Sequence, residues 1–289
     1  PQNFPARAPA EIRPRTVVAS NALVSTMIAG ILQTNLHAAL TELTGGQPTV
    51  AGGSYTNVRT RHQTSGTPIR RATECAYERF SALGLQSAYQ SWSAGGYSNR
   101  NVVGTLPGTT SSAQIVVVCA HIDDMPSGSL APGADDNASG SVAVFAAAEV
   151  LRRYSFERTL RFVLFTGEEQ GLYGSDAYAA AAKAAGETNL VALNLDMVAW
   201  DGNGDKVLNL YVRPGIAVEL DAAATFTNVA RVYGLATGVV ATVVQEAVDW
   251  SDHYSFNSYG LSAICLIEED VADFNPYYHT TNDVLARLN

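Results

Sequence analysis

Basic residues are scarce in this chain, and charged residues of either sign are few. Lys and Arg together number 18 against 27 Asp and Glu, which gives a net charge of −9, and charged residues make up only 16% of the sequence. A groove for nucleic acid or for an anionic membrane surface requires a basic stripe, which this chain lacks. We therefore expect neither nucleic acid nor lipid among its partners.

Long apolar runs are also missing. The stretch 142–150 is interrupted by Glu149 and falls short of the about 20 residues that cross a bilayer. We expect no membrane partner, and a monomer. Because the chain begins at Pro1 without an initiator Met, and shows no basic start followed by an apolar core, we also expect a processed, exported form that is secreted or periplasmic.

Cysteine is rare. The three cysteines, Cys75, Cys119 and Cys265, allow at most one intramolecular disulfide, and two of them sit inside apolar runs. A buried thiol in such a run behaves as a small hydrophobic side chain. The cysteines therefore leave both the disulfide state and the redox compartment open.

Internal repeats, low-complexity tracts and charge blocks are absent from the sequence, and the Gly- and Ser-rich patches are short. A length of 289 residues is sufficient for one large domain with a substantial buried core. We therefore expect residues 1–289 to form a single domain, in which residues 1–15 are an N-terminal extension.

Helical and strand-like patterns alternate along most of the chain. Helical spacing is found at 17–43, as one long or two short helices, and at 68–83, 138–154, 171–185, 216–233 and 252–258. Apolar and β-branched runs predict strands at 85–92, 101–106, 115–119, 160–166, 191–195, 207–212 and 263–267. The alternation indicates an α/β fold, with a mostly parallel mixed sheet sandwiched between helices and an antiparallel edge formed by the early strands.

Reactive side chains come directly after three of these strands. The strands at 115–119, 160–166 and 191–195 are followed by imidazole or carboxylate groups, namely those of His121, Asp123, Glu168, Glu169 and Asp196. The carboxyl ends of parallel strands lie at one edge of an open α/β sheet, which is where ligands bind. We therefore expect these side chains to meet at that edge.

Two loops add further groups, Asp135-Asp136 before the helix at 138–154 and His279 near the C-terminus. Each motif alone has an ordinary explanation, since acidic pairs usually lie on solvated surfaces. Together they predict a metal site, because carboxylates crowded at one edge repel each other and need raised pKa values or cations. Imidazole with carboxylate suits zinc, whereas an all-oxygen set would favour magnesium or calcium.

Five sequence motifs then point to a known family. They are His121-x-Asp123, GADDNASG at 133–140, GEEQGLYGS at 167–175, NLDM at 194–197 and YHTT at 278–281. In this order they resemble the secreted bacterial dizinc leucyl aminopeptidases, metallopeptidase family 28, which have a zinc-exopeptidase-like fold. The resemblance is firm from residue 121 to the end of the chain and looser over 64–108.

The resemblance implies a complete set of ligands for two zinc ions. His121 and Asp196 would bind one ion, Glu169 and His279 would bind the other, and Asp136 would bridge the two. Two zinc ions per chain are therefore the expected cofactors.

Three further features follow from the same resemblance. Glu168 is the expected general base. Asp123 is the expected carboxylate that fixes the ring orientation of His121, a role that metal-bound imidazoles generally require. The peptide bond between Asp136 and Asn137 is expected to be cis.

The chain also departs from the family at two positions. No cysteine precedes Ser251-Asp252-His253, where some relatives have a disulfide, so the wall of the adjoining pocket must differ. Relatives supply a tyrosine hydroxyl to the tetrahedral intermediate from one of two locations, and Val248 occupies one of them here. The resemblance therefore gives this catalytic role to Tyr278, next to His279.

The activity that the resemblance implies is removal of the first residue from peptides with a free N-terminus. A hydroxide that bridges the two zinc ions would attack the peptide carbonyl, and Glu168 would pass a proton to the departing amine. Large hydrophobic first residues are the expected substrates. Their side chains would bind in an apolar pocket for which the candidates are Met197, Ile267, Phe274 and Tyr277.

Three other interpretations stay open. A carboxypeptidase or amide deacylase of the same superfamily would need a cation for a substrate carboxylate, and no arginine lies inside the motifs above. A glutaminyl-cyclase-like enzyme uses a related fold with one zinc ion, whereas this chain has all five ligands. A non-catalytic peptide-binding module would have lost ligands, and here Glu168 and every ligand are present.

Overall fold

The computed structural model describes residues 19–235, 238–269 and 272–289. The extension expected at 1–15 lies outside these ranges. The helices in the described part of the chain are α1 (Ala22–Ala29), α2 (Gln33–Leu43), α3 (Thr67–Ala82), α4 (Gly140–Leu151), α5 (Tyr173–Ala184), α6 (Ala217–Val232) and α7 (His253–Ser258). Leu285–Arg287 forms a short helical turn, and the segment Ala134–Ser139 before α4 is kinked at Asp136 and Asn137.

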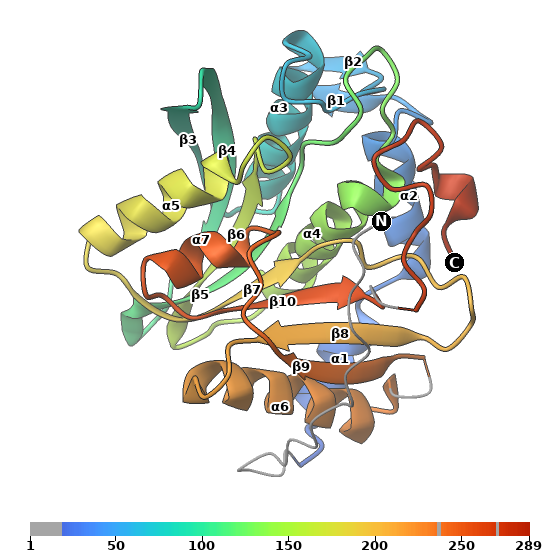
Figure 1. The fold of residues 1–289 in the computed structure, drawn as a ribbon. Coiled ribbons are helices and arrows are strands. Elements are labelled where there is room, and N and C mark those ends of the chain that lie inside the picture. The colour runs from blue at the N-terminus through green and yellow to red at the C-terminus, as the bar shows by residue number, and fades with distance from the viewer. Residues whose placement is uncertain (1–18, 236–237, 270–271) are drawn as a thin grey trace.

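Eight strands form one mixed sheet in the order β3-β4-β6-β5-β7-β10-β8-β9 (Figure 1). Their bounds are β3 (Gln86–Ala94), β4 (Tyr97–Leu106), β5 (Ser111–His121), β6 (Arg158–Phe165), β7 (Thr188–Leu195), β8 (Val207–Val212), β9 (Val240–Gln245) and β10 (Ala263–Glu268). The pairs β6-β5, β5-β7, β7-β10 and β8-β9 are parallel, whereas β3-β4, β4-β6 and β8-β10 are antiparallel. The expected α/β fold, with its antiparallel early strands, is thus confirmed.

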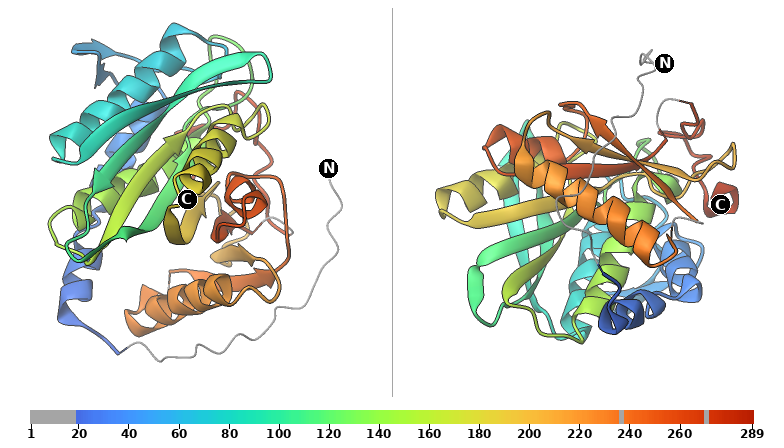
Figure 2. Two further views of the ribbon diagram at one scale, coloured as in Figure 1. Left: turned by 90° about the vertical axis from the view of Figure 1, so that its left-hand side faces the viewer. Right: turned by 90° about the horizontal axis from the view of Figure 1, so that it is seen from below.

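Helices cover both faces of this sheet (Figures 1 and 2). On one face, Phe165 of β6 packs in a cluster with Tyr178 of α5 and Phe256 of α7. On the other face, Phe162 of β6 packs with Phe80 of α3 in a core that α2 and α4 also enclose. Alternate residues of one strand point to opposite faces, so burial on both sides explains why the central strands are apolar throughout.

Two helical stretches differ from their predicted bounds for local reasons. The stretch expected at 17–43, as one long or two short helices, forms two helices that begin at Ala22, because α1 ends at Ala29 with Gly30 as its C-cap and the extended Leu32 precedes α2. The helix expected at 138–154 begins at Gly140, because Asp136 and Asn137 just before it have non-helical dihedral angles. The peptide bond between these two residues is cis, which confirms that prediction.

Three strands are not predicted by the sequence. β9 pairs with β8 at the edge of the sheet and is only partly buried, although its sequence, VATVVQ, is as apolar and β-branched as those of the predicted strands. β1 (Thr49–Ala51) and β2 (Ser54–Thr56) form a separate antiparallel hairpin of three residues each, too short for a periodic signal.

The three cysteines are buried and free. Each thiol therefore packs as a small hydrophobic group, as expected for the two in apolar runs. No single described helix has both the length and the apolar character of a membrane span. Only α1 and α2 taken together have them, and these two helices meet at a bend of 43°.

Candidate metal centre

Three adjacent strands bring reactive side chains to one edge of the sheet. β5 lies between β6 and β7 and runs parallel to both (Figure 1). His121 is the last residue of β5, Asp196 directly follows β7, and Glu168 and Glu169 lie in the turn after β6. The carboxyl-terminal edge of the sheet, where open α/β sheets bind ligands, thus gathers one imidazole and three carboxylates.

The loop before α4 adds the carboxylate of Asp136, which lies between two imidazoles. Its Oδ1 is 3.3 Å from Nε2 of His121, and its Oδ2 is 3.2 Å from Nε2 of His279. His279 comes from the C-terminal segment and has a φ of +58°, which is uncommon for residues other than glycine. One carboxylate therefore contacts both imidazoles.

Each imidazole also has a carboxylate of its own. Nε2 of His121 lies 3.3 Å from Oδ1 of Asp196, and Nε2 of His279 lies 2.9 Å from Oε2 of Glu169. The His121 side chain is buried, whereas that of His279 is 34% exposed. The site therefore has an inner and an outer half, and the two halves share the carboxylate of Asp136.

Glu168 lies beside the inner half. Two groups of side chains could each hold a metal ion, because the ligand atoms within each group lie within 4.8 Å of one another. One group is His121, Asp136 and Glu169, and the other is His121, Glu168 and Asp196. Oε2 of Glu168 is 4.0 Å from Nε2 of His121, farther than the 3.3 Å contacts made by Asp136 and Asp196. Glu168 thus borders the inner half, but Asp136 and Asp196 lie closer to His121 than it does.

The donor set of this site fits divalent metal ions. Oε1 of Glu169 is buried and has no hydrogen-bond partner among the described residues. A buried carboxylate oxygen without a partner is costly, so this atom is suited to a ligand from outside the chain. Imidazole nitrogens combined with carboxylate oxygens are the donors that zinc accepts.

Burial and mutual repulsion shift the pKa values of the groups at the site. Burial, and then Asp136, raise the pKa of Glu169 to about 8. Burial, with Glu169 and Asp196, raises the pKa of Glu168 well above its usual value. Burial opposes a charge on His279, but hydrogen bonds with Asp136 and Glu169 raise the pKa of this imidazole to about 10. A site with these properties attracts cations, either protons or metal ions.

Asp123 connects the end of β5 to the turn that carries Glu168. It is fully buried, and its carboxylate accepts hydrogen bonds from the N–H groups of Gly167, at 2.9 Å, and Glu168, at 3.4 Å. Nδ1 of His121 lies 3.7 Å from the carboxylate of Asp123 and 3.2 Å from its backbone oxygen. Asp123 therefore contacts the imidazole mainly through its main chain, and its carboxylate fixes the Glu168 turn.

Two residues that hold Asp196 are missed by the sequence analysis. Ser251 donates a hydrogen bond to Oδ2 of Asp196, and Nδ2 of Asn194 donates one to the Ser251 hydroxyl at 2.8 Å. Oδ1 of Asp196 is thereby left to face His121. The sequence offered one signal for this network, the amide of Asn194 in an otherwise apolar strand. A buried amide requires hydrogen-bond partners, so Asn194 indicates a buried polar contact next to Asp196.

Tyr278 lies at the open side of the site. Its ring stacks on the imidazole of His279, with the ring centroids 3.6 Å apart, and its side chain is 38% exposed. Burial, and then the carboxylates of Asp136 and Glu169, raise the pKa of Tyr278. Its hydroxyl therefore stays protonated at neutral pH and can donate a hydrogen bond.

Two of the four predicted pocket residues lie together. Met197 and Ile267 belong to one buried cluster, and Met197 directly follows Asp196. The other members of this cluster were not expected to line the pocket; they are Tyr211 and Cys265, with Val244, Val248 and Trp250 packed against them.

The other two predicted pocket residues lie apart from this cluster. Phe274 packs edge-on against Tyr278, with centroids 5.0 Å apart, and is 37% exposed. Tyr277 packs against the ring of Trp200 and under the guanidinium of Arg287. The predicted pocket is therefore divided into a buried part and an exposed aromatic part.

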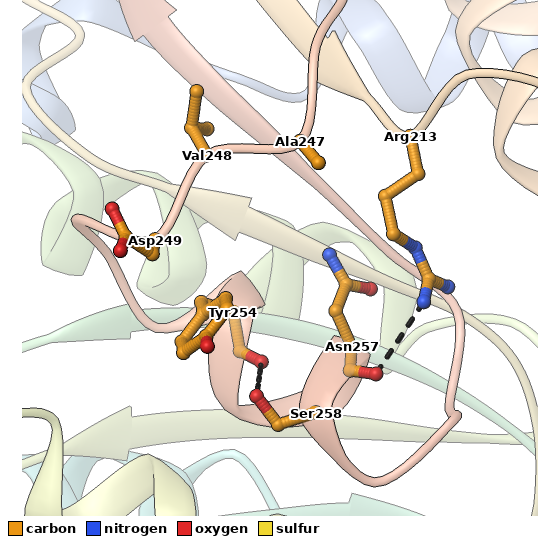
Figure 3. Close-up of a pocket in the computed structure, with 7 residues that line it drawn as sticks. All are labelled: Arg213, Ala247, Val248, Asp249, Tyr254, Asn257 and Ser258. Atoms are coloured by element: carbon orange, nitrogen blue, oxygen red, sulfur yellow. Dashed lines mark hydrogen bonds between the residues drawn. The ribbon is translucent and has the colours of Figure 1, made fainter.

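A separate cavity of about 380 Å³ contains none of the predicted site residues (Figure 3). Its lining residues are Arg213, Ala247, Val248, Asp249, Tyr254, Asn257 and Ser258. Val248 is the one residue that it shares with the Met197 cluster. The concave surface here and the metal centre are thus built from different residues.

Comparison with known proteins agrees with this geometry. The family model described as Peptidase family M28 matches residues 101–289, which is more than half of the chain. Leucine aminopeptidase 1 of Trichophyton rubrum is 30% identical over 293 residues, which cover 97% of this chain and 75% of that protein.

Solved structures share the fold. The LapA aminopeptidase of Legionella pneumophila superposes with a TM-score of 0.74 at 23% identity, over 92% of this chain and 69% of that one. A zinc aminopeptidase from Bacillus subtilis superposes with a TM-score of 0.57 at 26% identity, over 68% of this chain and 47% of that one. The family match confirms the resemblance seen in the sequence, and we conclude that the chain belongs to Peptidase family M28 as a metallo-aminopeptidase.

Proposed function

We propose that this chain uses two zinc ions to remove the N-terminal residue from peptides. The observation that carries the proposal is the contact of one carboxylate, that of Asp136, with the imidazoles of both His121 and His279. A carboxylate placed in this way is suited to bridge two metal ions. The zinc aminopeptidase from Bacillus subtilis, which shares this fold, supports the choice of metal.

The metal ligands would be shared between the two zinc ions in the same way as the imidazole–carboxylate contacts define the two halves of the site. His121 and Asp196 would hold one zinc ion, Glu169 and His279 would hold the second, and Asp136 would bind both. Zinc in such a site supplies Lewis acidity, which polarises the scissile carbonyl and makes a water molecule more acidic. The protein supplies the proton transfers and the orientation of the substrate.

Glu168 is the proposed general base. Its Oε2 lies beside the inner half of the site, 4.0 Å from Nε2 of His121, and Asp123 holds the turn on which it lies. It would take a proton from the attacking water and deliver the proton to the departing amine. General acid–base catalysis of this kind is worth on the order of 10²- to 10⁴-fold in rate.

Tyr278 is the proposed donor to the oxygen of the scissile carbonyl. Stacking on His279 fixes its ring beside the outer half of the site, and its raised pKa keeps the hydroxyl proton in place. A donor aimed at the developing oxyanion stabilises the transition state more than the ground state.

The proposed substrates are peptides with a free N-terminus and a large hydrophobic first residue. The excess of carboxylates at the site favours a substrate ammonium group nearby. The printed name of the relative from Trichophyton rubrum, leucine aminopeptidase, supports a preference for an apolar first residue. Phe274, which packs against Tyr278 and is 37% exposed, offers an apolar surface for such a side chain.

A panel of aminoacyl anilides, assayed with and without a metal chelator, tests this proposal. The Glu168→Gln variant and N-acetylated substrates serve as the controls. We expect fastest turnover of leucyl or phenylalanyl anilide, loss of activity with chelator, and recovery with zinc. Cleavage of N-acetylated substrates would contradict the aminopeptidase mechanism, and turnover that resists the chelator would contradict the metal mechanism.

A further inference from the structure

The loop that carries Asp136 is contacted by two charged side chains that are themselves buried. Arg61 is 0% exposed and Asp283 is 2% exposed. Charged side chains are rarely buried to this extent unless hydrogen bonds and an opposite charge compensate them. The hydrogen-bond partners of Arg61 and Asp283 therefore show which segments these two side chains hold in place.

Arg61 connects the loop to the strand end that carries His121. Its guanidinium donates hydrogen bonds to the backbone oxygens of Pro132 and Gly133, at 2.8 and 2.9 Å, in the loop before Asp136. Its Nε donates to the backbone oxygen of Ile122, at 2.7 Å, and Ile122 directly follows His121. One side chain thus fixes the relative positions of two segments that carry ligands.

The charge of Arg61 is balanced by Asp124. The carboxylate of Asp124 accepts hydrogen bonds from the backbone N–H of Arg61 at 3.0 and 2.9 Å and lies 3.4 Å from Nη1 of its guanidinium. Both side chains of this ion pair are 0% exposed. The guanidinium is therefore compensated in place and remains available to the carbonyl groups of the loop.

Asp283 contacts the same loop through its N–H groups. Its carboxylate accepts hydrogen bonds from the backbone N–H of Asp135, at 3.0 Å, and of Asp136, at 3.0 Å. Its backbone oxygen accepts a third bond from the N–H of Ala134, at 3.1 Å. Because Asp283 belongs to the same C-terminal segment as His279, these bonds fix the loop relative to the second imidazole.

The loop has little room to move between these contacts. Gly133 has a φ of +45°, and a Cβ added there would lie 2.3 Å from the backbone oxygen of Asp136 and 2.9 Å from Nη2 of Arg61. The backbone of the loop therefore approaches the guanidinium as closely as a residue without a side chain allows.

We propose that Arg61 and Asp283 act as positioning residues that set the place of the Asp136 carboxylate between the two imidazoles. Arg61 fixes the loop relative to His121 through its carbonyl groups, and Asp283 fixes it relative to His279 through its N–H groups. This inference rests on the proposed two-zinc function. It assigns a metal-positioning role to two residues that bind no metal themselves.

The test measures zinc affinity in the full chain. Asp283→Asn keeps the shape of the side chain but removes one acceptor oxygen, and Arg61→Lys keeps the charge but removes the planar set of donors. Each purified variant is stripped with chelator, checked for cooperative thermal unfolding, and titrated with zinc against a chromophoric chelator. If Arg61→Lys does not fold, the zinc affinity of the isosteric Asp283→Asn variant tests the proposal by itself.

A second ion pair, between Arg213, whose side chain is 23% exposed, and the buried Glu219, supplies controls away from the site. Arg213 donates hydrogen bonds to the backbone oxygens of Asn257 and Leu261, and the buried Glu219 accepts one from the backbone N–H of Ala263. Arg213→Lys and Glu219→Gln therefore make the same kinds of chemical change, loss of the planar donors and loss of an acceptor oxygen, away from the metal centre. A general loss of stability would affect both pairs of variants alike.

Changes to residues that orient metal ligands typically weaken metal binding by about 10- to 100-fold, and we expect this increase in the zinc dissociation constant for Asp283→Asn and Arg61→Lys. The two control variants should stay within about threefold of the parent, well below that range. Parent-like affinity in the site variants, or equal weakening in the controls, would overturn the positioning role while the parent still binds two zinc ions. A parent chain that binds no zinc would instead overturn the proposed function.

Discussion

His121 and His279 contact opposite oxygens of one carboxylate, at 3.3 and 3.2 Å, although one imidazole ends a central strand and the other belongs to the C-terminal segment. The shared carboxylate is that of Asp136, in the segment that connects β5 to α4. The site therefore exists only in the folded chain, and its two halves depend on the same side chain.

Replacement of Asp136 by alanine is expected to affect both halves. Without the shared carboxylate each half keeps only one imidazole and one carboxylate, fewer than the three protein ligands usual for catalytic zinc. We predict that zinc content, measured by plasma emission spectrometry after gel filtration, falls from about two ions per chain to below one. Asp221→Ala, an exposed carboxylate on α6, is the control and should keep the parental content. Full zinc content in Asp136→Ala would show that this carboxylate does not bridge.

Replacement of Glu168 by glutamine should separate catalysis from metal binding. The amide cannot accept the proton from water, so kcat is expected to fall by about 10²- to 10⁴-fold. Zinc content should stay at the parental level, because Glu168 makes no contact as short as those of Asp136 and Asp196. Steady-state kinetics on leucyl anilide check this, and turnover within a few-fold of the parent would remove Glu168 as the base.

Replacement of Tyr278 by phenylalanine removes the hydroxyl and retains the ring that stacks on His279. Loss of one donor to a developing oxyanion lowers kcat by about 10²-fold or more, and we expect a change of that order with little change in KM. Tyr55→Phe, at a tyrosine that is 82% exposed, should leave kcat unchanged. Equal kcat values for both variants would exclude the hydroxyl of Tyr278 from catalysis.

The metal-free protein should lose stability as pH rises. The folded-state pKa of His279 is raised to about 10, so the stability that its charge contributes is present below its unfolded pKa of about 6.5 and is lost as pH rises through 10. The pKa of Glu169 is raised to about 8, so the folded chain again holds a proton that the unfolded chain has released, and the sign is the same. We predict a Tm that falls between pH 6 and pH 10 after chelator treatment.

Zinc should counteract this loss, because metal binding requires neutral imidazoles and ionised carboxylates. The difference in Tm between zinc-loaded and metal-free protein is therefore expected to grow with pH. The comparison uses thermal unfolding at several pH values in one buffer series. A metal-free Tm that stays constant or rises with pH would show that these groups do not hold protons in the folded chain.

The fold and the edge that carries the site follow from sequence patterns with a physical basis. Central strands are buried on both faces, so their first polar residues stand out at the point where each strand ends. His121 after β5 and Asp196 after β7 are recognisable for this reason. β9 was missed although its sequence, VATVVQ, is apolar and β-branched, so this edge strand was within reach of the same pattern.

Residues that orient the site through long-range hydrogen bonds are harder to predict. Ser251 contacts Asp196, and Asp283 contacts the backbone of Asp136, only because the fold brings distant segments together. Arg61 is fully buried, whereas arginine is usually exposed, so its sequence context gives no sign of its position. Tyr277 is a predicted pocket residue from the family resemblance, and the contact of its ring with Trp200 had no signal in the sequence.

Anomalous diffraction at the zinc absorption edge, from crystals of the zinc-loaded chain, tests the two-metal centre most directly. Two anomalous peaks should flank the carboxylate of Asp136, one in contact with His121 and Asp196 and the other in contact with Glu169 and His279. A single peak, or two peaks of which one lies away from Asp136, would contradict the bridged pair of zinc ions.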